Sequence, residues 1–285
     1  MALFHYCRNE VLLALLSKRQ IWMSDLTLSN DSTEGRWVRH AFVDYCKKAK
    51  IESSNIDRLC VHLDSLLNGV RAVGYCLSEE GDLLSQWRGY ADGGRGVSIG
   101  FKREYLEALC ERTRTTQEKF GLALAQVLYT RADESQPIAD VTDKILAYVK
   151  QGALAANGLL LNDGDRATRQ KAFGAMTIAF LQYFPFIFKL KNAAFREEKE
   201  WRLLSVVLTG FQAGDLGQLG DVDYRAVEDR FIPYAVLDLP ELGIPPIEKI
   251  WLGPKNITPT LVMEGMLARF GFKNISIEKS AATYR

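Results

Sequence analysis

A segment dense in charge, Arg196–Arg202, runs directly into the apolar stretch 203–208 and constrains the fold more than any other part of the chain. The apolar stretch predicts a β-strand, in which successive side chains point to opposite faces of a sheet. With the strand beginning near Phe195, Trp201 and Leu203 would face the core. The charged side chains expected together on the other face are Arg196, Glu198, Glu200 and Arg202.

Two carboxylates on one face of a strand allow two interpretations. Neighbouring carboxylates raise each other's pKa and nearby guanidinium groups lower it, so the pair can be tuned as an acceptor, a base or a cation stabiliser. A solvated sheet face with cross-strand ion pairs produces the same pattern, because ion-pair networks also perturb pKa values. The segment alone leaves both interpretations open.

Length and charge predict one domain without a membrane segment. A chain of 285 residues, 47% apolar, can bury a large core. The net charge of +1 gives no overall attraction to nucleic acid or anionic membranes, although a local patch is not excluded. The apolar run 11–16 is too short for a signal peptide or a membrane span. We therefore expect a soluble, cytoplasmic protein.

The sequence contains no common metal or nucleophile motif. Its five cysteines are scattered without a C-x-x-C pair, and its three histidines lack metal-ligand spacing, so we expect reduced thiols and no metal. No nucleophile elbow, zinc-protease helix or kinase signature is present. These observations argue against a hydrolase of the common types, a metalloprotease and a kinase.

The pattern of elements predicts an α+β fold with a split, twisted sheet. Strands are expected at 3–6, 20–24, 71–78, 97–101, from 195, and at 230–237, 247–252 and 274–278. Helices are expected at 10–17, 37–50, 56–67, 83–90 and 259–270. Residues 103–188 predict three or four helices, clearest at 138–149 and 171–184. We interpret them as a mainly helical insertion in a single domain, 1–285.

Three strand residues are candidates for ligand binding. His5 is alone in the first strand, where a histidine is more often structural. Because Phe4 and Tyr6 would face the other way, its ring could instead point to a cleft and donate to a sugar hydroxyl. Tyr75 either packs in the core or offers a ring on which an aromatic ligand stacks. Ser78, at the end of the same strand, could orient the acidic segment.

The predicted helix 83–90 carries further candidates. Trp87 and Tyr90 fall on one face, a spacing more often found in a protein core. Arg88 points elsewhere and could meet a phosphate. The glycines at 93–96 do not form a complete phosphate-binding motif, and a tight turn explains them better.

The order of several short blocks resembles a widespread bacterial family, domain-of-unknown-function family 2971. The blocks are Phe4-His5-Tyr6, Ile21–Asp25 with Asn30, Asp31 and Glu34, Cys76-Leu77-Ser78-Glu79, Trp87 with Tyr90-Ala91-Asp92, Gly96–Phe101, and Glu198-x-Glu200-Trp201-Arg202. They lie between residue 4 and about residue 205, and the helical insertion between them is unmatched. Each block alone is weak, whereas the combination is specific.

That family's layout is similar to the ADP-ribosyltransferase fold, a split sheet that binds NAD in a cleft. In those enzymes a first-strand His or Arg holds the nicotinamide ribose, a middle strand supplies Tyr or Ser/Thr, and a late strand supplies a catalytic Glu within E-x-E. By position, the resemblance gives these roles to His5, to Tyr75 and Ser78, and to Glu198 and Glu200. The chain departs from one branch of the family, which has Gly followed by Thr or Ser after its histidine, and it lacks a second-strand Ser-Thr-Ser.

The resemblance also implies a role for each residue. Glu200 would stabilise the oxocarbenium ion formed when the nicotinamide–ribose bond breaks, and Glu198 would orient or deprotonate the acceptor. Arg88 and Arg202 are candidates for the pyrophosphate, and Tyr90 for a further cofactor contact. Arg202 could equally be a structural partner of the two glutamates.

The function implied is that of an NAD-dependent ADP-ribosyltransferase, a glycosyltransferase-class enzyme of a toxin or an antiviral (antiphage) defence system. NAD would be a substrate, a protein or nucleic acid the acceptor, and an antitoxin or defence-system protein a partner. Hydrolysis of NAD differs only in using water as the acceptor. The alternative is a non-catalytic nucleotide-sensing or protein-interaction module on the same fold.

Overall fold

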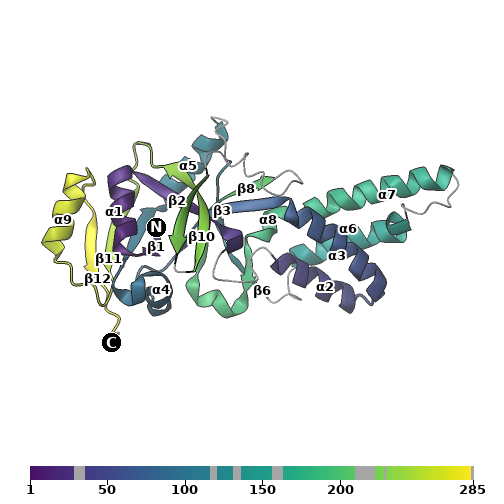
Figure 1. Cartoon of the computed structure of the whole chain (residues 1–285), viewed down its shortest axis with the longest axis horizontal. Helices are drawn as coiled ribbons and strands as arrows, with labels where there is room; N and C mark the ends of the chain where they lie inside the picture. The colour runs from purple at the N-terminus through teal and green to yellow at the C-terminus, as the bar shows by residue number, and fades with distance from the viewer. Residues whose placement is uncertain are drawn as a thin grey trace.

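A computed structural model describes residues 1–28, 36–115, 121–130, 136–155, 163–208, 222–227 and 229–283. It is a mixed α+β protein with a twisted sheet, as predicted, and the sheet is mostly antiparallel (Figure 1). Asn30, Asp31 and Glu34, which contributed to the family resemblance, lie outside the described residues. None of the helices within the described ranges is both long and apolar enough to span a membrane.

The main sheet has ten strands within the described residues, eight of them in the order β12-β11-β4-β1-β3-β2-β10-β9. The strand β8 pairs with β3, and β5 pairs with β8. Only β11 and β12 pair in parallel. The strands are β1 (Ala2–Cys7), β2 (Gln20–Asp25), β3 (Val70–Ser78), β4 (Val97–Lys102), β5 (Ala123–Gln126), β8 (Glu200–Leu208), β9 (Val222–Val227), β10 (Arg230–Asp238), β11 (Ile247–Leu252) and β12 (Ser276–Lys279). A separate parallel pair joins β6 (Leu128–Thr130) to β7 (Leu190–Asn192).

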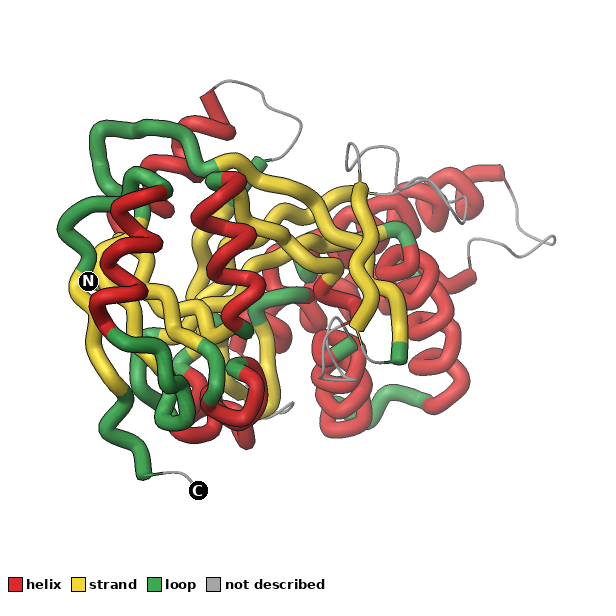
Figure 2. The backbone as a smooth tube through the Cα atoms, turned by 60° about the vertical axis from the view of Figure 1, so that its left-hand side comes forward, coloured by secondary structure: helices red, strands yellow, loops and turns green. Residues whose placement is uncertain are grey.

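Two hydrophobic cores divide the helices. The first lies on one face of the sheet, where α1 (Asn9–Lys18), α5 (Arg103–Thr115) and α9 (Thr260–Arg269) bury their apolar residues. The second joins α2 (Trp37–Lys48), α3 (Ser53–Asn68), α6 (Gln136–Lys150), α7 (Asp163–Leu181) and α8 (Phe184–Ile187). These five helices form a lobe that projects from one end of the sheet (Figures 1 and 2).

The region 103–188 differs in detail from the predicted helical insertion. It is mainly helical, but it also supplies β5 to the main sheet and β6 to the small one. The helix α5 packs in the core of the sheet, whereas α2 and α3, from outside the region, pack in the helical lobe. The lobe is therefore assembled from two parts of the chain, a long-range association that local periodicity does not reveal.

The strand β3 lies at the centre of the molecule and has two different edges. Along one edge it pairs with β8 over its whole length, from Val70 opposite Leu208 to Ser78 opposite Glu200. Along the other edge β2 pairs with it at residues 73 and 74, and β1 pairs with it at residue 78. Between these points β1 and β2 separate, and His5 Nδ1 donates to the carbonyl oxygen of Cys76 at 2.8 Å. The imidazole thus fills a position that a neighbouring strand would otherwise occupy.

Backbones approach closely where the turn after α4 (Leu84–Tyr90) meets β1, which gives a test of the packing. A Cβ at Gly96 would lie 2.1 Å from the carbonyl oxygen of Cys7, so Gly96→Ala should lower the free energy of unfolding by about 3 kcal/mol. Gly89→Ala, in α4 with no atom within 4 Å of a new Cβ, should leave stability unchanged or raise it by up to about 1 kcal/mol. Urea unfolding of both variants measures the difference, and equal stabilities would contradict the packing described.

Candidate functional site

The acidic segment is a short 3₁₀ helix followed by a strand, not one continuous strand as predicted. The 3₁₀ helix η4 (Ala193–Glu198) starts at Asn192, whose side chain accepts a hydrogen bond from the amide of Ala194. Lys199 then takes a left-handed conformation (φ 43°), and β8 begins at Glu200. Arg196 is consequently an exposed residue of η4 and does not share a face with Arg202.

The carboxylate of Glu200 is buried, and cations occupy both of its oxygens. Arg202 donates from Nε to Oε1 at 2.7 Å and from Nη2 to Oε2 at 3.1 Å, and Lys191 donates to Oε2 at 2.8 Å. The backbone N–H of Glu200 donates to the Tyr129 hydroxyl at 2.7 Å. Glu200 is 5% exposed and Arg202 1%. Arg202 also donates to the carbonyl oxygen of Phe188, which ties β8 to the end of the helical lobe.

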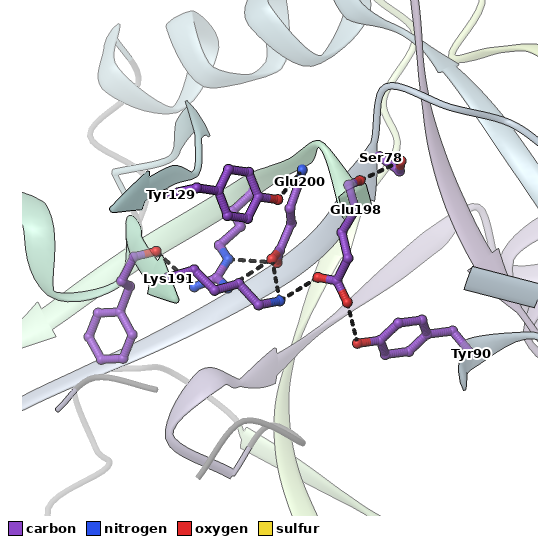
Figure 3. Close-up of polar contacts among 8 residues, drawn as sticks. Ser78, Tyr90, Tyr129, Lys191, Glu198 and Glu200 are labelled. Carbon is purple, nitrogen blue, oxygen red and sulfur yellow. Dashed lines mark hydrogen bonds and ion pairs between the residues drawn. The ribbon is translucent and has the colours of Figure 1, made fainter. Parts of the chain in front are cut away.

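Lys191, on β7, brings the two glutamates together. Its ammonium group lies 2.5 Å from Glu198 Oε2 and 2.8 Å from Glu200 Oε2. Figure 3 shows the lysine between the two carboxylates. The pair predicted to share a strand face therefore does meet, but through a third residue and from two different elements.

Glu198 lies on the more accessible side of this cluster. The Ser78 hydroxyl donates to its backbone carbonyl at 2.7 Å and so fixes the end of η4 against β3. The Tyr90 hydroxyl approaches Glu198 Oε1 at 3.4 Å (Figure 3). The Glu198 side chain is 12% exposed and Tyr90 is 41% exposed, compared with 6% for the Glu200 side chain. Glu198 is thus the carboxylate of the pair that is nearer to solvent.

The charges in the cluster hold Glu200 in its ionised form. Burial by itself would raise the pKa of Glu200, but Arg202 and Lys191 together outweigh burial and lower this pKa to about 2. Burial would lower the pKa of Lys191, and Glu200 and Glu198 raise it above its ordinary value. At neutral pH Glu200 is therefore a permanently charged acceptor with no proton to exchange.

His5 and Tyr75 are together, but on the other side of the sheet from the glutamates. Their rings stack with centroids 3.9 Å apart. Because directly paired residues share a face, the pairings of Phe4 with Ser78 and of Ser78 with Glu200 put these three residues on one face. Successive residues of a strand point to opposite faces, so His5, which follows Phe4, points to the other face of the sheet. Tyr75 is buried in the first core on that face.

The remaining predicted residues have different surroundings. Trp87 is fully buried against Tyr6, while Arg88 is exposed on α4.

Burial lowers the pKa of His5 to about 4, although its bond to the Cys76 carbonyl opposes this, so the ring is neutral near pH 7. Since a carbonyl oxygen only accepts, the proton of the neutral ring is on Nδ1, and Nε2 is an acceptor.

Sequence reasoning missed Lys191 and Tyr129, which hold the acidic pair. Both lie on the short strands β6 and β7, each of three residues, and neither strand has enough residues for a periodic pattern. The cluster of Lys191, Glu198, Glu200 and Arg202 has two positive and two negative charges. It can accept hydrogen bonds or stabilise a cation through Glu198, while Glu200 keeps the geometry.

The burial of Glu200 predicts how stability depends on its charge. Glu200→Gln should lower the free energy of unfolding by about 3–5 kcal/mol at pH 7, because Arg202 stays buried without its anion. Since the folded pKa is lowered from 4.5 to about 2, the stabilisation is complete above about pH 5 and is lost as the pH falls towards 2. Urea unfolding between pH 3 and 7 measures both effects.

A matched control is Glu107→Gln, which removes a half-exposed carboxylate paired with Arg103 in α5. This change should alter stability by less than about 1 kcal/mol. Equal effects of the two substitutions, or an unchanged pH dependence in Glu200→Gln, would show that the buried ion pairs do not stabilise the fold.

One comparison with known proteins finds a family match for part of the chain. Residues 86–203 match the model of a family described as a protein of unknown function (DUF2971). No curated protein matches the chain, and no solved structure matches it. The matched segment runs from α4 into β8 and includes Tyr90, Lys191, Glu198 and Glu200. It supports the resemblance of this chain to that family of unknown function. The match includes the helical region 103–188, which we expected to be unmatched, and it does not include the blocks before residue 86.

Proposed function

We propose that the chain has an ADP-ribosyltransferase-type fold and cleaves the bond between nicotinamide and ribose in NAD. The observation that carries the proposal is the fixed position of Glu198, an acceptor on the open side of an otherwise buried ion cluster. Ser78 and Lys191 hold this residue from opposite ends, at its carbonyl and at its carboxylate. Such a preorganised acceptor favours positive charge that develops in a transition state.

The two glutamates have different roles in this proposal. Glu198 faces the ribose, stabilises the oxocarbenium ion and accepts a hydrogen bond from the 2′-hydroxyl. Glu200 contacts no substrate, because two buried cations hold both of its oxygens and its side chain is only 6% exposed, and it positions Lys191. This assignment exchanges the roles that the E-x-E resemblance implies, and the accessibility of the two carboxylates is the reason.

The reaction breaks the C–N bond so that its electron pair leaves with neutral nicotinamide. A lone pair of the acceptor then attacks C1′ of the ribosyl cation, and the proton of the acceptor passes to Glu198 or to water. A protein or nucleic-acid nucleophile gives ADP-ribosylation, and water gives ADP-ribose. Tyr90 and Arg88, both exposed on α4, are the groups best situated to contact the substrate. We assign His5, Tyr75 and Arg202 to structural support.

A second candidate is a non-catalytic module that binds a nucleotide or a partner protein. The neutral charge of the cluster favours it, since Lys191 and Arg202 already balance both carboxylates. In such a module Glu198 and Tyr90 would still contact the ligand, but no bond would break. Turnover distinguishes the two functions.

The proposal predicts that Glu198→Gln abolishes turnover without unfolding the protein. Nicotinamide release from NAD should fall by roughly 10²-fold or more, since an electrostatic contact to the transition state is removed. The control is Glu79→Gln, a carboxylate near the same end of β8 that accepts from Trp201 and Gln126. Chromatography of nicotinamide measures the rate. Saturable NAD binding without turnover would favour the sensing module. If the wild type neither binds nor cleaves NAD, both proposed functions are wrong.

An enzyme that consumes NAD or modifies an essential target should slow bacterial growth. Expression of the wild-type chain should therefore reduce the growth rate, and Glu198→Gln at an equal protein level should not. Growth curves with matched immunoblots provide the measurement. Equal growth of the two cultures would contradict a role as a toxin.

A further inference from the structure

An arginine on β9 is partly buried, and no described carboxylate serves as its counter-ion. The side chain of Arg225 extends across the neighbouring strand β10, and its Nη2 donates to the Ser24 hydroxyl on β2 at 3.0 Å. Its Nε is buried and has no hydrogen-bond partner, and within the described part of the chain no carboxylate forms an ion pair with Arg225. The nearby Asp223 accepts from Tyr234 instead.

Burying a guanidinium group without a counter-ion costs free energy. Burial lowers the pKa of Arg225, since removing a guanidinium from water disfavours its charge. A buried guanidinium is ordinarily paired with a carboxylate or satisfied by several acceptors, because it has five N–H donors. Here a single hydroxyl oxygen is its described partner. A ligand anion would supply the missing negative charge.

The Ser24 hydroxyl is a further donor beside the guanidinium. Its oxygen accepts from Arg225, so its own hydrogen remains available for another acceptor. The guanidinium fork and the hydroxyl together offer more donors than the two oxygens of a carboxylate can use in one plane. A phosphate group has three or more acceptor oxygens and satisfies this set better.

We propose that Arg225 and Ser24 form a binding site for a phosphate group of a small-molecule ligand. The site lies where β1 and β2 separate along β3, since Ser24 pairs with Gly74 at that edge. Arg225 is only partly buried, so the site is not sealed from solvent.

The phosphate site and the acidic cluster are on the same face of the sheet. Ser24 is opposite Gly74 and Glu200 is opposite Ser78, and the four-residue separation along β3 corresponds to about 13 Å. Cys76, exposed, lies between them on that face. A dinucleotide could reach from one to the other, but the phosphate site does not depend on NAD cleavage, because it rests on Arg225 and Ser24 alone.

Arg225 also acts on the pKa of His5. Burial is the main reason for its lowered pKa, and the positive charge of Arg225 lowers it further. An anion bound to Arg225 would screen this repulsion. The chemical shift of the His5 ring therefore offers a local probe of occupancy.

The test is binding of inorganic pyrophosphate, measured by isothermal titration calorimetry with sodium chloride adjusted to constant ionic strength. We expect saturable binding by the wild type, weakened at least tenfold by Arg225→Gln and to a smaller extent by Ser24→Ala. The matched control is Arg230→Gln, which removes the same charge from an exposed ion pair on β10 and should leave binding unchanged. A parallel titration with succinate tests whether the site binds a carboxylate ligand instead of a phosphate.

The stability of ligand-free Arg225→Gln separates a binding role from a structural one. Loss of an unpaired buried charge should leave the Tm unchanged or raise it, and pyrophosphate should raise the Tm of the wild type only. No binding by the wild type, equal binding by Arg225→Gln, or binding of succinate alone would overturn the proposal. So would a lower Tm of ligand-free Arg225→Gln, since Arg225 would then be a structural bridge to Ser24.

Discussion

The buried contact between Glu200 and its two cations organises the centre of this protein. Glu200 begins β8, Lys191 comes from β7, and Arg202 reaches from β8 to the carbonyl of Phe188 beside the helical lobe. A buried ion pair adds little net stability relative to apolar packing, but loss of one partner is costly, so it favours a single arrangement. That arrangement fixes the sheet, the lobe and the acidic segment relative to one another.

Local patterns in the sequence were sufficient to predict most helices and long strands, and the α+β class. They failed where tertiary contacts decide the conformation. The segment before Glu200 has charges at the spacing of a strand, yet Asn192 starts a 3₁₀ helix and Lys199 turns left-handed so that Glu198 can reach Lys191. Lys191 itself could not be identified as the partner, because its position depends on pairing between β6 and β7, 62 residues apart at Leu128 and Leu190.

The predicted grouping of His5 and Tyr75 with the glutamates depended on a register that a sequence does not contain. A shift of one residue moves every side chain of a strand to the other face. Phe4 lies opposite Ser78, so the side chain of Phe4, and not that of His5, points to the face of the sheet that carries the acidic cluster. The stacked pair of His5 and Tyr75 instead closes the gap between β1 and β2, where the imidazole satisfies the Cys76 carbonyl.

One face of the sheet thus carries both groups to which we assign chemistry. At one end the carboxylate of Glu198 lies in the ion cluster, and towards the other end no described residue supplies an anion to the guanidinium of Arg225. A ligand with a positive or electron-poor centre and a phosphate suits this separation of charge. The balance of the central cluster also explains why Glu198, and not Glu200, is the group available to such a ligand.

The central claim is that Glu200 remains ionised because Lys191 and Arg202 hold its carboxylate. A carbon-detected NMR titration of the glutamate side-chain carboxyls, with the Glu200 signal assigned from Glu200→Gln, measures its pKa directly. The account predicts a midpoint near pH 2, or no titration before acid unfolding. A midpoint at or above the ordinary glutamate value of about 4.5 would contradict it.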